Sequence, residues 1–166
     1  MNPLRVDCIN QKAPYWVIQD PEHPNNYYMT SDNGVRFDID FSYNDAVIPS
    51  GAYEIGIANR KHKPSPLDMK LKESIYAIIE EFFEQNNDVM LYLTETGDDK
   101  QSFRNRLFIR WFNTYEHHDR YVIRTAEGFL EDQENFMAII LRIDNPRLAL
   151  AIEEFEETAA LLFGQE

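Results

Sequence analysis

The sequence predicts a single-domain α+β fold in which about three helices pack on a largely antiparallel sheet. Two observations support this prediction. In the first part of the chain, apolar residues alternate with polar ones, as in strands that bury only one face. Further on, apolar residues recur with the helical period in segments that are separated by short, continuously apolar runs. The resulting order of strands, helix, strand, helix, two strands and helix is typical of an α+β domain.

The N-terminal half is predicted to form a short strand, then a hairpin and a further strand. Residues 15–18 are the first candidate, and residues 27–30 and 35–41 flank an Asn33-Gly34 pair. Asn-Gly between apolar runs is a strong hairpin signal, because both residues tolerate positive φ. Apolar side chains occupy every second position of residues 35–41, and the alternation returns over residues 53–57. One face of this meander is therefore expected to be buried.

The middle of the chain predicts one helix and three strands. Ser65 precedes a proline and can act as the N-cap of a helix over residues 66–85, whose apolar residues share one arc. Residues 89–93 and 136–143 are continuously apolar, which is typical of strands covered on both faces. Residues 121–123 are predicted to form a shorter strand between them.

All 166 residues are assigned to one domain, with residues 1–14 as a mobile N-terminal segment. Cys8 is the only cysteine, so no intramolecular disulfide can form, and a reducing compartment is expected. The first residues lack the apolar run of a signal peptide, and no stretch approaches the roughly 20 apolar residues that cross a bilayer. We therefore expect a cytoplasmic protein that does not insert in a membrane, and no cofactor is indicated.

The chain is strongly acidic, with 29 acidic and 16 basic residues and a net charge of −13. Such a surface repels nucleic acid and anionic membranes, so both are expected to be poor partners. The charge has a simple explanation in solubility. It also suits a protein partner with a basic surface, and a homodimer remains open.

Residues 104–120, RNRLFIRWFNTYEHHDR, combine an aromatic stripe with clustered charges. On a helical wheel Trp111 and Tyr115 fall on the apolar arc, which predicts that they pack in the core. Arg106 and Arg110, one turn apart, share the opposite face with Asn113, and two like charges at that spacing repel each other. We favour compensation by internal carboxylates, but a patch of Arg106, Arg110 and Asn113 that binds an anion or a partner remains open.

The adjacent histidines His117 and His118 do not predict a metal site. Neighbouring residues of a helix point about 100° apart, so their two rings cannot easily share one ion. Histidines also complement the negative end of a helix, which makes a polar helix terminus the simpler interpretation. Phosphate-binding loops and glycine-flanked nucleophilic serines are absent from the sequence, so no catalytic residue is assigned.

The last predicted helix begins after Asn145, which we assign as its N-cap. Its outer face is acidic, but two leucines lie among the glutamates, three turns apart. Leucines rimmed by glutamates on one stripe suggest contact with another chain. The residues that define this candidate surface are Leu150, Glu153, Glu157 and Leu161, and we place Glu154 and Glu156 on the same face.

Two stretches resemble a family of small uncharacterised bacterial proteins, a domain of unknown function. These are YYMTSDNGVRFDIDF and IIEEFFEQNNDVMLYLTETGDDKQSFRNRLFIRWF, and the Thr30 to Gly34 turn and the Asp99 to Phe112 segment are their most recognisable parts. The resemblance covers most of the chain from about Tyr27 onward. It implies a bacterial, single-domain, cytosolic protein and brings no activity, ligand or catalytic residue.

Two functions are compatible with these features. The sequence favours a non-catalytic interaction or regulatory protein that uses its acidic surface to bind another protein or itself. The alternative is an enzyme, most plausibly a hydrolase, with polar groups that converge from dispersed positions. Candidates for that site are Asp38, Asp40, Arg106 and His118.

Overall fold

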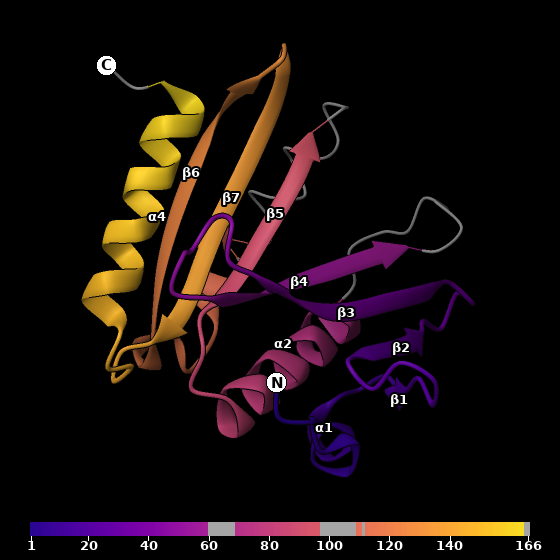
Figure 1. Cartoon of the computed structure of the whole chain (residues 1–166). Helices are drawn as coiled ribbons and strands as arrows, with labels where there is room; N and C mark the ends of the chain where they lie inside the picture. Colours follow the sequence, from indigo (N-terminus) through magenta and orange to yellow (C-terminus); the bar gives the residue numbers. More distant parts are fainter. Residues whose placement is uncertain (60–68, 97–108, 111, 165–166) are drawn as a thin grey trace. The chain divides into compact units, whose positions relative to one another are not determined.

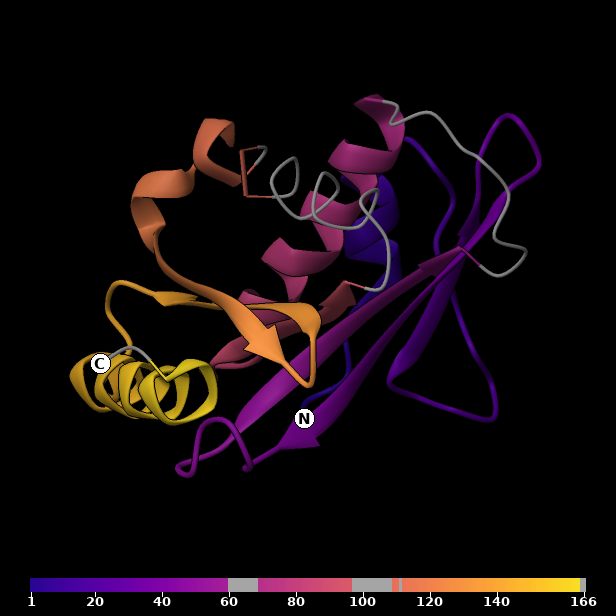
Figure 2. The same cartoon turned by 90° about the horizontal axis from the view of Figure 1, so that it is seen from above.

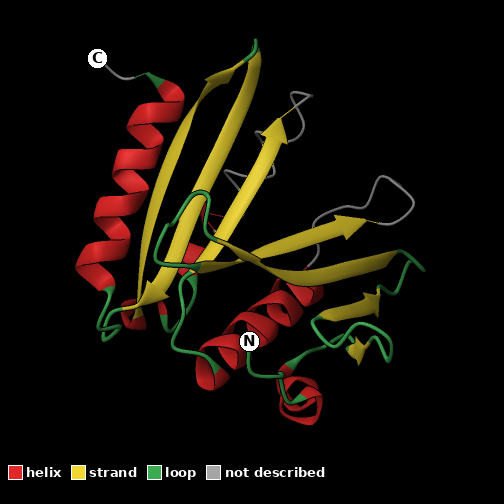
Figure 3. Ribbon diagram, viewed as in Figure 1, coloured by secondary structure: helices red, strands yellow, loops and turns green. Residues whose placement is uncertain are grey.

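The computed structural model describes residues 1–59, 69–96, 109–110 and 112–164. It confirms the α+β prediction: its one sheet has seven strands in the order β1-β2-β3-β4-β5-β7-β6 and is mostly antiparallel (Figure 3). Residues 109–110 and 112–114 are also helical. The labelled elements (Figure 1) are α1 (Val6–Lys12), β1 (Ile18–Gln19), β2 (Asn26–Thr30), β3 (Arg36–Asn44), β4 (Ala52–Asn59), α2 (Met69–Gln85), β5 (Met90–Thr96), η1 (His118–Arg120), β6 (Tyr121–Leu130), β7 (Gln133–Arg142) and α4 (Leu148–Phe163).

The chain divides into two compact units. The N-terminal unit comprises Met1–Ser42 and Ile55–Asn87, and the C-terminal unit comprises Tyr43–Glu54 and Asp88–Glu166. Strands β3 and β4 each begin in one unit and end in the other.

In the N-terminal unit, β1, β2 and β3 pair antiparallel, and α2 contributes the largest share of the core. The α2 residues Ile75, Ile78, Ile79 and Phe82 are buried, as their helical spacing predicts. The rings of Phe41 and Phe82 stack with centroids 5.2 Å apart. The start predicted for this helix, residues 65–68, lies outside the described residues.

The β2–β3 hairpin forms where Asn33-Gly34 predicts it, but with a different turn. Gly34 N–H donates to the Ser31 carbonyl oxygen at 2.9 Å, and within residues 31–34 only Gly34 has positive φ, at 73°. This geometry fits a three-residue loop with a left-handed last residue, and a two-residue Asn-Gly turn would need both residues left-handed. Gly34 is therefore the residue of this turn whose left-handed conformation favours glycine, and Asn33 does not need a positive φ.

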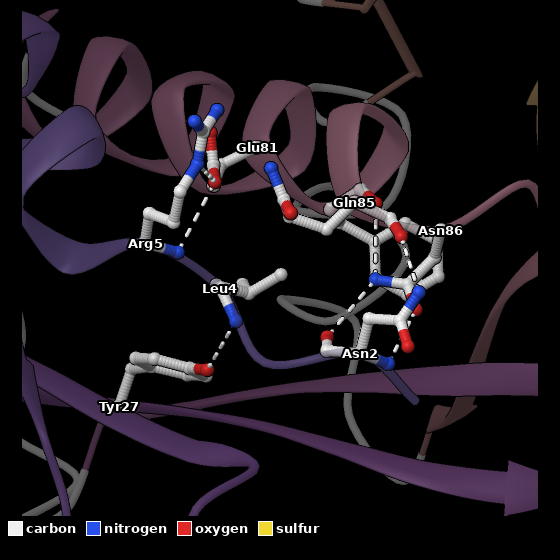
Figure 4. Close-up of polar contacts among 8 residues, drawn as sticks. Asn2, Leu4, Arg5, Tyr27, Glu81, Gln85 and Asn86 are labelled. Carbon is white, nitrogen blue, oxygen red and sulfur yellow. Dashed lines mark hydrogen bonds and ion pairs between the residues drawn. The ribbon is translucent and has the colours of Figure 1, made fainter.

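Residues 1–14 contain a helix, α1, where we expected a mobile segment. Figure 4 shows the chain just before this helix lying against α2. Arg5 donates its backbone N–H and its Nε to Glu81 Oε1, at 3.1 and 3.0 Å, and Leu4 N–H donates to the Tyr27 hydroxyl at 3.3 Å. The Leu4 and Ile9 side chains are buried. Sequence periodicity could not reveal this helix, because its seven residues bury only Ile9.

The first predicted strand, residues 15–18, is shorter than expected, because β1 begins only at the last of these residues. Only Ile18 of residues 15–18 belongs to β1. Before β1, the backbone N–H groups of the buried residues Tyr15 and Val17 donate to side chains and not to a neighbouring strand. Tyr15 N–H donates to Ser74 Oγ at 3.0 Å, and Val17 N–H donates to Asn10 Oδ1 at 2.7 Å.

In the C-terminal unit, β5 is the central strand. It pairs parallel with β4 at Tyr53↔Met90 and antiparallel with β7 over its whole length, and β6 completes the sheet. Consecutive residues are buried at the start of β5 (Met90 and Leu91) and in the second half of β7 (residues 137–141), so both faces are covered there, as their continuous apolar sequences predict. Helix α4 packs on one face through a buried cluster that includes Val89, Leu91, Met137, Ile139, Leu141, Ala151 and Phe155.

Two details of this unit differ from the sequence-based expectation. Strand β6 extends to Leu130 and joins β7 through Glu131 and Asp132, whose φ values of 50° and 65° are positive. Helix α4 begins at Leu148, because Asn145 caps a separate turn: its Oδ1 accepts Arg147 N–H at 2.8 Å and its carbonyl accepts Leu148 N–H at 3.0 Å. Asn145 is therefore not the N-cap of the helix.

The first prediction concerns the anchoring of the N-terminal residues. Replacing Glu81, whose side chain is only 7% exposed, by alanine removes the acceptor of Arg5 N–H. We expect Glu81→Ala to lower the free energy of unfolding by about 1–3 kcal/mol, measured by urea denaturation. Glu81→Gln retains an oxygen acceptor and should lose less. An alanine variant as stable as the wild type would show that this contact does not hold the segment.

The second prediction concerns the end of α4. A Cβ added at Gly128 in β6 would lie 2.5 Å from Phe163 Cγ and 2.6 Å from Phe163 Cβ. We therefore expect Gly128→Ala to lower the free energy of unfolding by about 1–3 kcal/mol through overpacking. In a Phe163→Gly background, which removes the Phe163 Cβ as well as the ring, the same substitution should cost much less, and the double-mutant cycle measures the difference. Equal costs in both backgrounds would contradict this contact.

Candidate functional site

Helix α4 is fastened to the C-terminal unit along one flank by the loop before β4. Arg147 Nη1 donates to the Ser50 carbonyl oxygen at 2.7 Å, and Glu154 Oε2 accepts the Ser50 hydroxyl at 2.6 Å. One turn further, Thr158 Oγ1 donates to the Val47 carbonyl oxygen at 2.8 Å. These three side chains, from the N-cap residue Arg147 and from Glu154 and Thr158 of α4, lie on one stripe, because residues seven and eleven positions apart share a helix face. The opposite flank of the helix lacks comparable ties among the described residues.

The outer face of α4 carries the predicted surface of leucines and glutamates. Leu150 is 45% exposed and Leu161 is 87% exposed, and Glu153 and Glu157 beside them are exposed as well. Glu154 departs from the prediction that it belongs to this face. It is half-buried and bonded to Ser50, so it fastens the helix instead.

A groove of about 780 Å³ lies along the other flank of α4, within the C-terminal unit. We call its two sides the α4 wall and the Arg110 wall, and β6 forms its floor. Figure 2 shows α4, in yellow, and the helical residues before β6, in orange, on opposite sides of the β6–β7 pair. The α4 wall includes Glu156, Ala159, Ala160 and Phe163, the Arg110 wall includes Ile109, Arg110, Asn113 and Thr114, and the floor includes Thr125, Ala126 and Glu127.

Two of the three residues of the predicted arginine patch line this groove. Arg110 and Asn113 are both exposed on the Arg110 wall, and Arg106 lies outside the described residues. The internal ion pair that we favoured for these arginines is not formed by Arg110 within the described chain. Glu127 and Glu156 face the same groove, so the described part of its lining carries two carboxylates and one guanidinium. The sequence alone could not bring Arg110 together with residues of α4, because that contact depends on the sheet between them.

Of the aromatic residues of this region, the structure describes Phe112 and Tyr115. Phe112 is buried, and its ring meets that of Tyr121 with centroids 5.9 Å apart, as expected for a core position. Tyr115 is half-buried and lies edge-on to the His117 ring. Trp111 lies outside the described residues, so its predicted packing stays a prediction.

The other polar candidates are divided between the two units. Asp38 pairs with Arg36 at 2.8 Å in the N-terminal unit, which also contains Asp40. His118 belongs to the C-terminal unit, where its Nδ1 lies 2.8 Å from the Tyr115 carbonyl oxygen. In the part of the chain that the structure describes, no three His, Cys, Asp or Glu side chains are grouped as metal ligands, and no helix has the length and apolar character to cross a membrane.

One titratable group near the start of α4 has a displaced pKa. The guanidinium of Arg142 donates to both carboxylate oxygens of Asp144, at 2.9 and 2.7 Å. This hydrogen bonding holds the pKa of Asp144 below its ordinary value. The pair is exposed at the end of β7 and belongs to the surface rather than to the groove.

Comparison with known proteins adds a family but no activity. No curated protein sequence matches the chain significantly. Among solved structures, the chain is similar to that of a candidate phosphinothricin N-acetyltransferase, with a TM-score of 0.41 and 7% sequence identity over 76% of this chain and 72% of the other. A likeness of this extent supports no conclusion about activity. Residues 67–157, more than half of the sequence, match a family model that includes the Asp99 to Phe112 segment, and the chain therefore belongs to a family of unknown function, DUF6169.

Proposed function

We propose that this protein is a non-catalytic interaction or regulatory protein that binds a basic partner protein through its C-terminal unit. The observation that carries the proposal is the outer face of α4. Leu150 and Leu161 expose large apolar side chains on a helix whose inner face and one flank are already fastened. Apolar side chains rimmed by charges are a common composition of protein-binding surfaces.

The distribution of charge indicates what kind of partner fits. The C-terminal unit contains 18 acidic and 8 basic residues, a net charge of −10, whereas the N-terminal unit contains 11 and 8, a net charge of −3. A surface of this sign attracts basic proteins and accelerates their association. It repels nucleic acid and also opposes association of two copies of the acidic unit. A basic protein is therefore the favoured partner over a homodimer.

The hydrolase alternative receives less support. Asp38 and Asp40 belong to one unit and His118 to the other, and Arg106 lies outside the described residues. The described residues of either unit do not gather this set into one site. We place the binding protein in the bacterial cytoplasm, which the solitary Cys8 supports because a reducing compartment suits a chain without disulfides.

The proposal predicts that reversing charge on the outer face of α4 removes the partner. In affinity purification from the native host, the double variant Glu153→Lys/Glu157→Lys should lose proteins that the wild type captures, because like charges would then face a basic surface. With a purified partner, the affinity should fall by tenfold or more, measured by isothermal titration calorimetry.

A matched control is available on α2. Glu73 and Glu84 are also exposed helical glutamates, but they belong to the N-terminal unit. Glu73→Lys/Glu84→Lys changes the net charge by the same amount and should leave the captured proteins unchanged. If both double variants capture the same partners as the wild type, the outer face of α4 is not the binding surface.

A further inference from the structure

We propose that the groove beside β6 binds an extended, basic segment of a partner protein, which adds a strand to the β6 edge. This inference rests on the proposed interaction function and names the recognition mode. Strand β6 ends the sheet order, so among the described residues it has a strand neighbour on one side only, β7. Its free side lies in the groove between the two helical walls.

The phase of the β6–β7 ladder determines which backbone groups point into the groove. Ile143 N–H donates to the Arg120 carbonyl oxygen at 2.9 Å, so Arg120 and Ile143 form a hydrogen-bonded pair. Such pairs alternate along an antiparallel ladder, and the register continues without a break to Leu130↔Gln133. The even-numbered residues of β6 therefore bond to β7. The free side presents the N–H and C=O groups of Ile123, Thr125 and Glu127.

An independent contact agrees with this assignment. Arg124 Nη1 donates to the Ile123 carbonyl oxygen at 2.9 Å. A side chain can reach that oxygen readily when it points away from β7, as the ladder phase requires. An incoming strand would bond to the same row of carbonyl and amide groups, which is the basis of recognition by strand addition.

The dimensions of the groove suit a single extended segment. Its volume of about 780 Å³ is within the range of ligand-binding clefts. Side chains of an added strand would alternate between the two walls. On one side they would meet Ala159, Ala160 and Phe163, and on the other Arg110 and Asn113.

A second copy of β6 does not fit as the occupant. Helix α4 packs directly over β6, since Phe163 lies against Gly128 and Ala126 packs on the core cluster beneath the helix. Neighbouring strands are about 4.8 Å apart, whereas packed helices need roughly 8–10 Å between their axes. Antiparallel pairing of two β6 strands places both α4 helices on the same face and would therefore force them to overlap. A segment that carries no helix over its strand avoids this clash.

Charge complementarity defines the chemistry of the segment. Glu127 on the floor and Glu156 on the α4 wall are both exposed, and the surrounding unit has a net charge of −10. A lysine or arginine of the segment would lie near these carboxylates. Alternate apolar residues would cover the alanines and Phe163 of the α4 wall.

The test uses the full chain and a display library of random linear dodecapeptides. Thr125→Pro removes an N–H that points into the groove and leaves the β7 ladder intact, since proline is tolerated where a strand edge is free. Thr125→Val is the matched control, because it changes the side chain and retains the N–H. Peptides enriched on the wild type should carry Lys or Arg between apolar residues. They should bind Thr125→Val within about twofold of the wild type and Thr125→Pro at least tenfold more weakly.

A second measurement does not depend on the folding of the proline variant. Methylating alternate backbone amides of an enriched peptide should abolish binding in one phase and preserve it in the other, because only one edge of an added strand bonds to β6. No enrichment, equal binding to Thr125→Pro, or indifference to methylation in both phases would overturn strand addition. Peptides that keep binding to Thr125→Pro but are lost from Glu153→Lys/Glu157→Lys would refute it and support the outer face of α4. Peptides that require the Thr125 N–H, together with protein partners that Glu153→Lys/Glu157→Lys still captures, would support β6 and refute the outer face.

Discussion

Helix α4 is held from beneath and from one flank, and this asymmetric attachment determines which surfaces the C-terminal unit offers. Phe155 and Ala151 anchor it in the core, while Arg147, Glu154 and Thr158 bind the loop at Val47 and Ser50. The flank that is bonded to the loop offers few groups to another protein, because its polar side chains already have hydrogen-bond partners. The outer face of α4 and its side next to β6 do not make these bonds to the loop. They are therefore the two sides of α4 that remain as candidate binding surfaces.

An open strand edge is normally a hazard, because any extended chain can pair with it. Here the edge is restricted in two ways. Arg124 and Glu127 place charges along it, and the Arg124 guanidinium already occupies the Ile123 carbonyl oxygen. The helical walls admit a thin segment but exclude another layered sheet. Such an arrangement lowers the risk of edge-to-edge aggregation and keeps the backbone groups of Thr125 and Glu127 available to a selected segment.

The elements predicted from the sequence are those whose residues are buried on most sides. The elements that it missed pack against little of the protein. The continuous apolar runs of β5 and β7 and the helical spacing of α2 follow directly from burial. Strand β6 was recognised only at its start, since an edge strand packs against less of the protein and its alternation is weak. Glu131-Asp132 is not a recognised signal for a turn with two positive φ values. In the groove, Arg110 and Asn113 were identified from their helix face, but the α4 wall could be assigned only once the sheet order was known.

The Arg110 guanidinium, the one cation among the described residues of the groove, argues for a segment of mixed composition rather than a polycation. Long-range attraction from the −10 unit is screened over roughly 8 Å at physiological ionic strength, so it favours encounter with any basic protein. Close contact is different, because Arg110 on one wall opposes a cation that Glu127 and Glu156 attract. A uniformly basic tail would be attracted by Glu127 and Glu156 and repelled by Arg110. A segment with its basic residue beside the carboxylates and a neutral or acidic residue beside Arg110 satisfies all three, and this local pattern distinguishes a partner from other cations.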